Sequence, residues 1–160
     1  MKVGDLMSRN PRTCSPNETL DRAARIMWDD DCGCVPVIDA DRRVIGMITD
    51  RDICMAAYTQ GVPLTASSIE SAMAKNPICC KASDTPATAE HLMQHFRIRR
   101  LPVVDDQRRL VGVVSLADLV HAMATRQTFG GDGMTWQAIA RTLCAVSSPR
   151  RFVPPSAAAE

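Results

Sequence analysis

The sequence predicts a mixed α/β (α+β) fold built from two tandem units, each with the order strand, helix, strand, strand, helix. The first observation behind this prediction is an internal repeat. Residues 5–53 align without a gap with residues 71–119, at a constant offset of 66 residues, and fourteen of the 49 aligned positions are identical. The second observation is that each repeat alternates short β-branched runs with apolar residues at helical spacing. The chain is therefore two copies of one supersecondary unit.

Local signals define the elements of the first unit. Asn10-Pro11 breaks the chain, and a polar turn separates two apolar, β-branched runs that read as a hairpin. The expected elements, in order, are an extended piece at Arg12–Cys14, a helix opened by Ser15-Pro16-Asn17-Glu18 with Leu20, Ala23, Ala24 and Met27 on one face, strands at Cys34–Asp39 and Val44–Thr49 joined by the turn Ala40–Arg43, and a closing helix at Asp50–Tyr58.

The second unit repeats this order after a linker at Gln60–Ser68 that contains Gly61 and Pro63. Its expected elements are Ile78–Cys80, a helix at Asp84–His95, strands at Arg100–Asp105 and Leu110–Ser115, and a closing helix at Leu116–Thr125. A unit of this size buries little apolar surface alone, so the two units are expected to pack on each other. The predicted division is residues 1–62, residues 63–126, and an extension at 127–160.

The extension lies outside the repeat. It is expected to contain a glycine-rich break at Gly130-Gly131-Asp132-Gly133 and a helix at Met134–Val146. Trp136, Ile139, Leu143 and Val146 would share one face of that helix and pack on the rest of the chain or on a partner subunit. A basic turn at Ser147–Arg151 and a frayed tail at Phe152–Glu160 are expected to follow.

Composition narrows the class of protein. The chain is 46% apolar, and its net charge of +1 gives no reason to expect nucleic acid or an anionic membrane as a partner. Seven cysteines, an odd number, are typical of a reduced cytoplasmic protein. Cys32-Gly33-Cys34 suggests redox or metal chemistry, and His91 and His95 would share a helix face. Neither group has the four spaced ligands of a structural zinc site, so no metal is expected.

The repeat contains one conspicuous motif. VIGMITDRDI at residues 44–53 corresponds to LVGVVSLADL at 110–119, which doubles the pattern Gly-x-x-Thr/Ser-x-x-Asp at a strand-to-helix junction. A capping box between Thr49 and Asp52 accounts for the Thr-to-Asp spacing. It does not account for the preceding glycine, which would let a ligand approach the backbone closely. A helix start can hold a phosphate, and a carboxylate one turn further on can accept hydrogen bonds from a ribose.

These motifs resemble tandem CBS domains, the modules named after cystathionine β-synthase. The resemblance covers residues 1–125 and rests on CVPVID with VIGMITDRDI in the first unit and on RRLPVVD with LVGVVSLADL in the second. It implies two units related by a pseudo-twofold axis (a Bateman module), with two clefts that bind ligands containing adenosine. The aspartate of each motif would contact ribose, and the Thr or Ser would lie near phosphate or ribose.

The resemblance also implies that each cleft is shared between the units. What we call the first cleft would use Gly46, Ile48, Thr49 and Asp52 with Pro77, Ile78, Cys79, Arg99 and Arg100. What we call the second cleft would use Gly112, Val114, Ser115 and Asp118 with Pro11, Arg12, Thr13, Gly33 and Cys34.

The two clefts are therefore expected to differ. Arg99 and Arg100 would give the first cleft two guanidiniums that can hold a phosphate in forked geometry. The second cleft has Gly33 and Cys34 at those positions, so it is expected to bind phosphate less well. AMP or ATP is accordingly expected to bind better than S-adenosylmethionine. The alternative for Arg99 and Arg100 is a solvated turn that pairs with Asp105 or Asp106.

The expected function is regulatory: an adenine-nucleotide sensor without catalytic activity and without a required cofactor, acting on an effector protein that the sequence does not name. One alternative is an assembly module whose clefts have lost their ligand. Another is a redox or metal sensor that uses Cys32, Cys34 or Cys79-Cys80. The closing helices, residues 50–58 and 116–125, have more apolar surface than one packing face needs, and this predicts a homodimer.

Overall fold

The computed structural model describes residues 1–125 and 134–148. The glycine-rich break, most of the basic turn and the tail predicted above lie outside the described residues. The elements are, in chain order, η1 (Val3–Asp5), β1 (Ser8–Arg9), α1 (Leu20–Asp29), β2 (Cys34–Ile38), β3 (Val44–Thr49), α2 (Asp50–Gln60), η2 (Leu64–Ala66), η3 (Ile69–Ser71), β4 (Ala74–Lys75), β5 (Cys80–Lys81), α3 (Pro86–Phe96), β6 (Arg100–Val104), β7 (Leu110–Ser115), α4 (Leu116–Thr125) and α5 (Trp136–Ser147).

The predicted α/β class and the repeated order of elements are confirmed. The helix predicted to open at Ser15 instead begins at Leu20, and Ser15–Glu18 forms a turn in which the Glu18 carboxylate accepts a bond from the Ser15 N–H (2.7 Å). The helix starts late because Thr19 is extended and bridges to Ser68 of the linker. The extended piece at Arg12–Cys14 makes a single parallel bridge from Cys14 to Val37.

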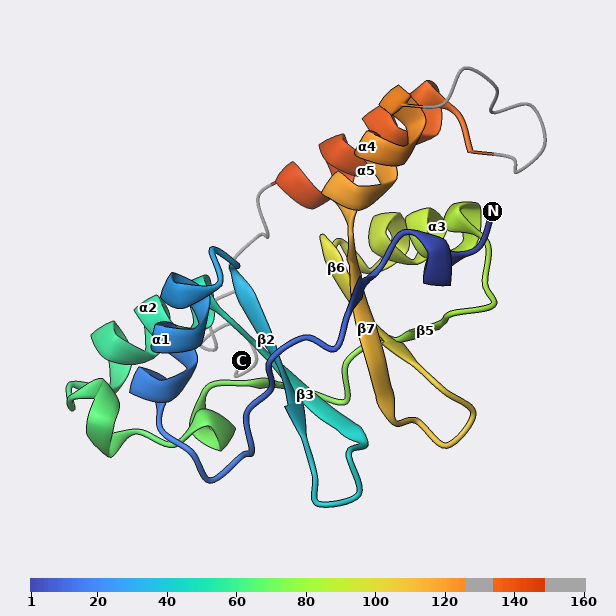
Figure 1. Cartoon of the computed structure of the whole chain (residues 1–160). Coiled ribbons are helices and arrows are strands. Elements are labelled where there is room, and N and C mark those ends of the chain that lie inside the picture. The colour runs from blue at the N-terminus through green and yellow to red at the C-terminus, as the bar shows by residue number, and fades with distance from the viewer. Residues whose placement is uncertain (126–133, 149–160) are drawn as a thin grey trace, which may run out of the picture.

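Two sheets lie side by side between two groups of helices (Figure 1), with α1 and α2 at one end and α3, α4 and α5 at the other. One sheet has the order β2-β3-β4 and the other the order β1-β7-β6-β5. Each sheet is built around one predicted hairpin, β2 with β3 and β6 with β7, and both pairs are antiparallel. The hairpins form because short β-branched runs flank a polar turn.

The two units exchange their first segments, which the sequence did not indicate. β1, near the N-terminus, pairs with β7 of the second unit, whereas β4, after the linker, pairs with β3 of the first unit. Val3 and Met7 are accordingly buried in the core of the second unit, and Ile69 is buried in the core of the first. Neither hydrophobic core is made from one repeat alone.

The pseudo-twofold relation between the units extends to single backbone groups. The Val44 N–H donates to the Arg108 carbonyl at 3.1 Å, and the Leu110 N–H donates to the Arg42 carbonyl at 3.0 Å, so the two bonds are reciprocal under the 66-residue offset. The non-glycine residues with positive φ in the described chain also fall into matched pairs. They are Asn10 with Asn76, Asp31 with Arg97, and Arg42 with Arg108.

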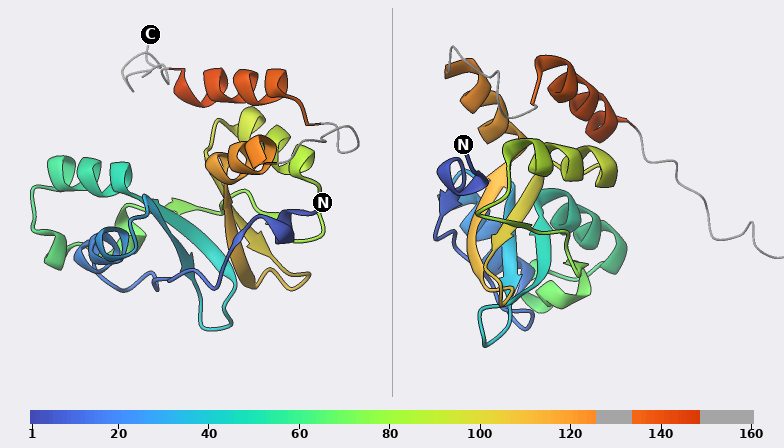
Figure 2. Two further views of the ribbon diagram at one scale, coloured as in Figure 1. Left: turned by 45° about the horizontal axis from the view of Figure 1, so that its top comes forward. Right: turned by 90° about the vertical axis from the view of Figure 1, so that its right-hand side faces the viewer.

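Helix α5 breaks this symmetry. It lies over α3 on the outside of the second unit (Figure 2), and its Ile139 is buried in the same core as Leu119 and Met123 of α4. The Thr142 hydroxyl, also fully buried, donates to the Glu90 carboxylate of α3. The prediction that the extension contains a helix that packs back on the chain is confirmed. Trp136 and Leu143, predicted to share the packing face, are 57% and 54% exposed.

Candidate functional site

The Thr/Ser-x-x-Asp motifs both form capping boxes at the junctions β3–α2 and β7–α4. In the first, Asp52 Oδ2 accepts bonds from the Thr49 N–H (3.0 Å) and hydroxyl (2.6 Å), and the Asp52 N–H donates to Thr49 Oγ1 (3.2 Å). Ser115 and Asp118 repeat the three bonds at 2.7, 2.7 and 3.2 Å. All of these carboxylate bonds use Oδ2, and Oδ1 of each half-buried aspartate has no hydrogen bond to another described residue.

The glycines of the motif have a packing role. A Cβ at Gly112 would lie 2.6 Å from Met7 Sδ and 2.8 Å from the Ser8 carbonyl oxygen of the paired strand β1. A Cβ at Gly46 would overlap the Met73 sulfur in the same way. The missing side chain at each position is therefore filled by a methionine of the exchanged segment, which corrects the expectation that these glycines leave room for a ligand.

Two further residues expected in the clefts are core residues. Ile48 and Val114 are each 0% exposed and belong to the cores of the first and second units. Val114 alternates along β7 with half-buried residues of the opposite face, whereas Ile48 of β3 follows the buried Met47, so both side chains lie in the interior. Their side chains therefore hold the strands in place, and neither lines the second cleft described next.

The second cleft is a cavity of about 370 Å³, which is within the size range of small-ligand sites. It is shared between the units as the resemblance implied. Of the residues expected there, the structure brings together Pro11, Arg12, Gly33, Cys34, Ser115 and Asp118. Thr13, Gly112 and Val114 do not line it. The lining includes residues that the sequence did not indicate, namely Ser8, Ile26, Asp30, Asp31, Cys32, Pro36, Arg100 and Val113.

Arg100 is the main correction to the expected clefts. It lines the second cleft, where Gly33 and Cys34 were expected to stand in place of the two arginines of the first cleft. Arg100 begins β6 directly opposite Ser115 of β7 in the antiparallel ladder. The room for its side chain comes from Gly33, since a Cβ there would lie 2.9 Å from Arg100 Nη2. The second cleft therefore has two guanidiniums in its lining, Arg12 and Arg100, and the first cleft loses one that was expected there.

Residues expected in the first cleft are divided between the second cleft, which Arg100 lines, and a separate groove of the described chain. Pro77, Ile78 and Cys79 line a wide groove of about 820 Å³ with residues of the two hairpin turns, such as Asp39 and Arg108. Thr49, Asp52 and Arg99 are absent from that lining. Arg99 is exposed, and its carbonyl accepts the Leu116 N–H at 2.8 Å.

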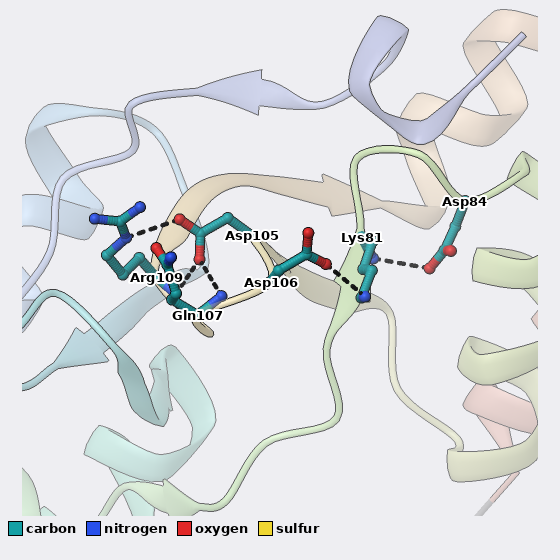
Figure 3. A network of polar contacts seen from close by, with 6 residues as sticks. All are labelled: Lys81, Asp84, Asp105, Asp106, Gln107 and Arg109. Carbon is teal, nitrogen blue, oxygen red and sulfur yellow. Dashed lines mark hydrogen bonds and ion pairs between the residues drawn. The ribbon is translucent and has the colours of Figure 1, made fainter.

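The alternative that Arg99 and Arg100 pair with Asp105 or Asp106 is wrong. Figure 3 shows that Asp105 is bound within its own turn, where it accepts the Arg109 N–H at 2.9 Å and Arg109 Nε at 2.8 Å. These bonds, led by the one from the Arg109 backbone, lower the pKa of Asp105. Asp106 pairs with Lys81 at 2.7 Å. Both carboxylates have partners from the turn and from β5, so neither needs Arg99 or Arg100.

Comparison with known proteins identifies the family. The family model described as "CBS domain" matches residues 3–58 and again residues 66–125. The chain belongs to the CBS domain family. A relative of similar length is the CBS domain-containing protein YhcV of Bacillus subtilis, which is 34% identical over 128 residues covering 80% of this chain and 89% of YhcV. The chain spans 23–25% of the length of the enzymes among its relatives, so it is similar to only part of each.

Solved CBS domain pairs have the same fold. The pair of protein MJ0100, determined with 5'-methylthioadenosine and S-adenosyl-L-methionine, has a TM-score of 0.71 at 28% identity and covers 78% of this chain and 96% of its own. CBSX2 of Arabidopsis thaliana, determined with AMP, has a TM-score of 0.68 at 25% identity and covers 77% and 96%. Related CBS pairs therefore bind adenosine-containing ligands.

The cysteines of this CBS pair are all free thiols. Burial raises the pKa of Cys34, in the second cleft, to about 11, although the nearby Arg100 lowers it in part. Burial likewise raises the pKa of Cys14 to about 11 and that of Cys80 to about 12. Reactive cysteines have lowered pKa values, so the thiols at these three positions do not have the properties of a redox site.

Residues 1–125 and 134–148 contain neither a metal-binding cluster nor a membrane-spanning helix. No group of three or more His, Cys, Asp or Glu side chains in this part of the CBS pair is arranged to hold a metal ion. His91 and His95 do share a face of α3, with ring centroids 6.2 Å apart. None of the helices in the same part of the chain is long and apolar enough to span a membrane.

Proposed function

We propose that this CBS pair is a regulatory module that binds an adenine nucleotide, AMP or ATP, and has no catalytic activity of its own. The observation that carries the proposal is the composition of the second cleft. Asp118 offers a carboxylate oxygen for ribose, and Arg100 offers a guanidinium for phosphate beside Ser115. The AMP complex of CBSX2 and the adenosyl complexes of MJ0100 support an adenosine ligand.

The regulatory role follows from how the cleft is built. Its lining comes from both units, with Pro11 and Cys34 on one side and Ser115 and Asp118 on the other. A ligand that contacts both sides binds one relative arrangement of the units better than others, and it can shift the population toward that arrangement. The effector protein would respond to this shift. The unpaired thiols suit a reduced cytoplasmic compartment.

A thermal-shift panel of AMP, ADP, ATP, NAD and S-adenosylmethionine tests the proposal. A ligand present at a hundredfold its Kd stabilises the folded state by about 2.7 kcal/mol. For a chain of this size this raises Tm by roughly 5–10 °C. AMP or ATP is expected to produce this rise, and Asp118→Ala is expected to reduce it to about half or less. A panel with no shift at millimolar ligand would leave the assembly module as the better explanation.

A further inference from the structure

The second cleft has more carboxylates in its lining than a ribose and phosphate site requires. Asp30, Asp31 and Asp118 line the cavity, and the cationic side chains of its lining within the described residues are Arg12 and Arg100. The capping box and the ribose account for Asp118. Asp30 and Asp31 remain unexplained by the proposed function.

Both guanidiniums already have carboxylate neighbours. Arg12 Nη1 lies 3.1 Å from Asp30 Oδ1 and 3.7 Å from Asp29 Oδ2, and this pairing raises the pKa of Arg12. Arg100 Nη2 and Asp50 Oδ2 lie 2.9 and 3.2 Å from the same point, the Cβ position that Gly33 lacks. Each cation can still contact one phosphate, and each has a carboxylate near it, Asp30 beside Arg12 and Asp50 near Arg100.

This arrangement is specific to the second cleft. Under the 66-residue offset, the counterparts of Asp30, Asp31 and Asp50 are Phe96, Arg97 and Leu116. No acidic residue occupies any of the three matching positions. The acidic surroundings of Arg12 and Arg100 are therefore not a by-product of the repeated fold.

We propose that Asp31 and Asp50, with Asp30, make the second cleft selective for a nucleotide with one phosphate. This inference rests on the proposed function. With the ribose on Asp118, the first phosphate lies against Arg100. A second and a third phosphate add negative charge, and they extend toward Asp50 or toward Asp30 and Asp31. A phosphate and a carboxylate that lie close together repel each other strongly where solvent is partly excluded.

Calorimetric titration of the full chain with AMP, ADP and ATP, at low salt and without Mg²⁺, tests the selectivity. AMP is expected to bind at least about tenfold more tightly than ATP, a large difference for one interaction, with ADP between them. In the double variant Asp31→Asn/Asp50→Asn the ratio of the Kd for ATP to the Kd for AMP is expected to fall to about threefold or less, because ATP binding improves more than AMP binding. Asp30 is left in place so that it still holds Arg12.

The matched control is the double variant Asp21→Asn/Asp41→Asn. It makes the same change in net charge, and Asp21 occupies the first turn of α1 as Asp50 does in α2. This control is expected to keep the wild-type ratio. Asp118→Asn should weaken AMP binding, which assigns the titration to the second cleft.

The outcomes separate this inference from the proposed function. If AMP binds but ATP binds equally well or better, the selectivity is wrong and the proposed function stands. The selectivity is also wrong if the control changes the ratio as much as the cleft variant does, because the effect would then come from net charge. If none of the three nucleotides binds, both proposals fail.

Discussion

At the scale of single residues, the aspartates of the repeated motif serve the fold, and the proposed ligand role falls to the oxygen that the fold leaves unbonded. Oδ2 of Asp52 and of Asp118 completes a capping box, and Oδ1 has no hydrogen bond to another described residue. The capping box is therefore a correct but incomplete explanation of the motif. The difference between the two copies comes from their neighbours, because Arg100 lies in the cleft of Asp118.

Replacing Asp118 by Ala is expected to weaken nucleotide binding about ten- to a hundredfold. The reason is the loss of a charge-assisted hydrogen bond to ribose, worth about 1.5–3 kcal/mol. Calorimetry with AMP measures it. Asp52→Ala is the matched control, since both variants lose an equivalent capping box and about 1 kcal/mol of stability. A larger loss of affinity in Asp52→Ala would show that the first cleft is the principal site.

The buried thiols predict a pH dependence of stability. Burial raises the folded-state pKa of Cys34 to about 11 and that of Cys80 to about 12, whereas the value for a free thiol is 9.0. Between pH 9 and 11 the unfolded chain releases protons that the folded chain keeps, so the free energy of unfolding falls as pH rises. Urea denaturation at pH 7, 9 and 10.5 measures this fall.

The control for the pH dependence is Cys80→Ala. The variant loses some stability at every pH because it leaves a small cavity, but its fall between pH 9 and 10.5 is expected to be shallower than in the wild type. Equal slopes in the two proteins would assign the pH dependence to groups other than Cys80.

At the scale of elements, helix α5 makes a buried polar contact with α3 in addition to its apolar packing. Thr142 of α5 and Glu90 of α3 are 0% and 7% exposed, and the hydroxyl donates to the carboxylate. The position that matches Glu90 in the first unit is Ala24, so α1 offers no such acceptor. This pairing helps to explain why α5 packs on the second unit and not on the first.

Replacing Thr142 by Ala is expected to destabilise the fold by about 1–3 kcal/mol, because the Glu90 carboxylate stays buried without its donor. Urea denaturation measures the change. Thr59→Ala is the control, since the Thr59 hydroxyl is exposed and bonds only to the Met55 carbonyl of its own helix. That control is expected to stay within about 0.5 kcal/mol of the wild type. A similar cost in both variants would rule out a special role for the buried contact.

At the scale of the whole molecule, the apolar surfaces of the two closing helices are buried to different extents. In α4, Leu119 and Met123 are buried in the same core as Ile139 of α5. In α2, Met55 and Tyr58 are 47% and 84% exposed, so this helix retains the open apolar surface that motivates a dimer. The homodimer thus remains a proposal, and its best-supported part is the α2 face.

Light scattering at micromolar concentration tests the dimer. A mass near twice 17.5 kDa is expected for the wild type. Tyr58→Glu is expected to give a monomer, because a carboxylate buried at an interface is costly. Gln107→Glu adds the same charge on an exposed hairpin turn and is expected to remain dimeric. A wild-type mass near 17.5 kDa would contradict the dimer and leave α2 exposed in a monomer.

The sequence by itself determined the family, the repeat and most elements. Strands β3 and β7 and helix α4 have the predicted bounds, because apolar periodicity and polar turns are local signals that the sequence displays directly. The spacing of Thr49 and Asp52 predicted the capping box for the same reason. Six of the nine residues expected in the second cleft, from Pro11 to Asp118, do meet there.

How the two units are joined, and which charged side chains lie together, could be seen in the tertiary structure alone. The exchange pairs β1 with residues more than a hundred positions later in the chain, and β4 with residues about thirty positions earlier. Both strands have only two residues, so they leave no periodic signal in the sequence. Arg100 was expected in the first cleft and lines the second, because its direction depends on the space left by Gly33, 67 residues earlier. Such contacts depend on side-chain packing across the pseudo-twofold axis, which local sequence patterns do not encode.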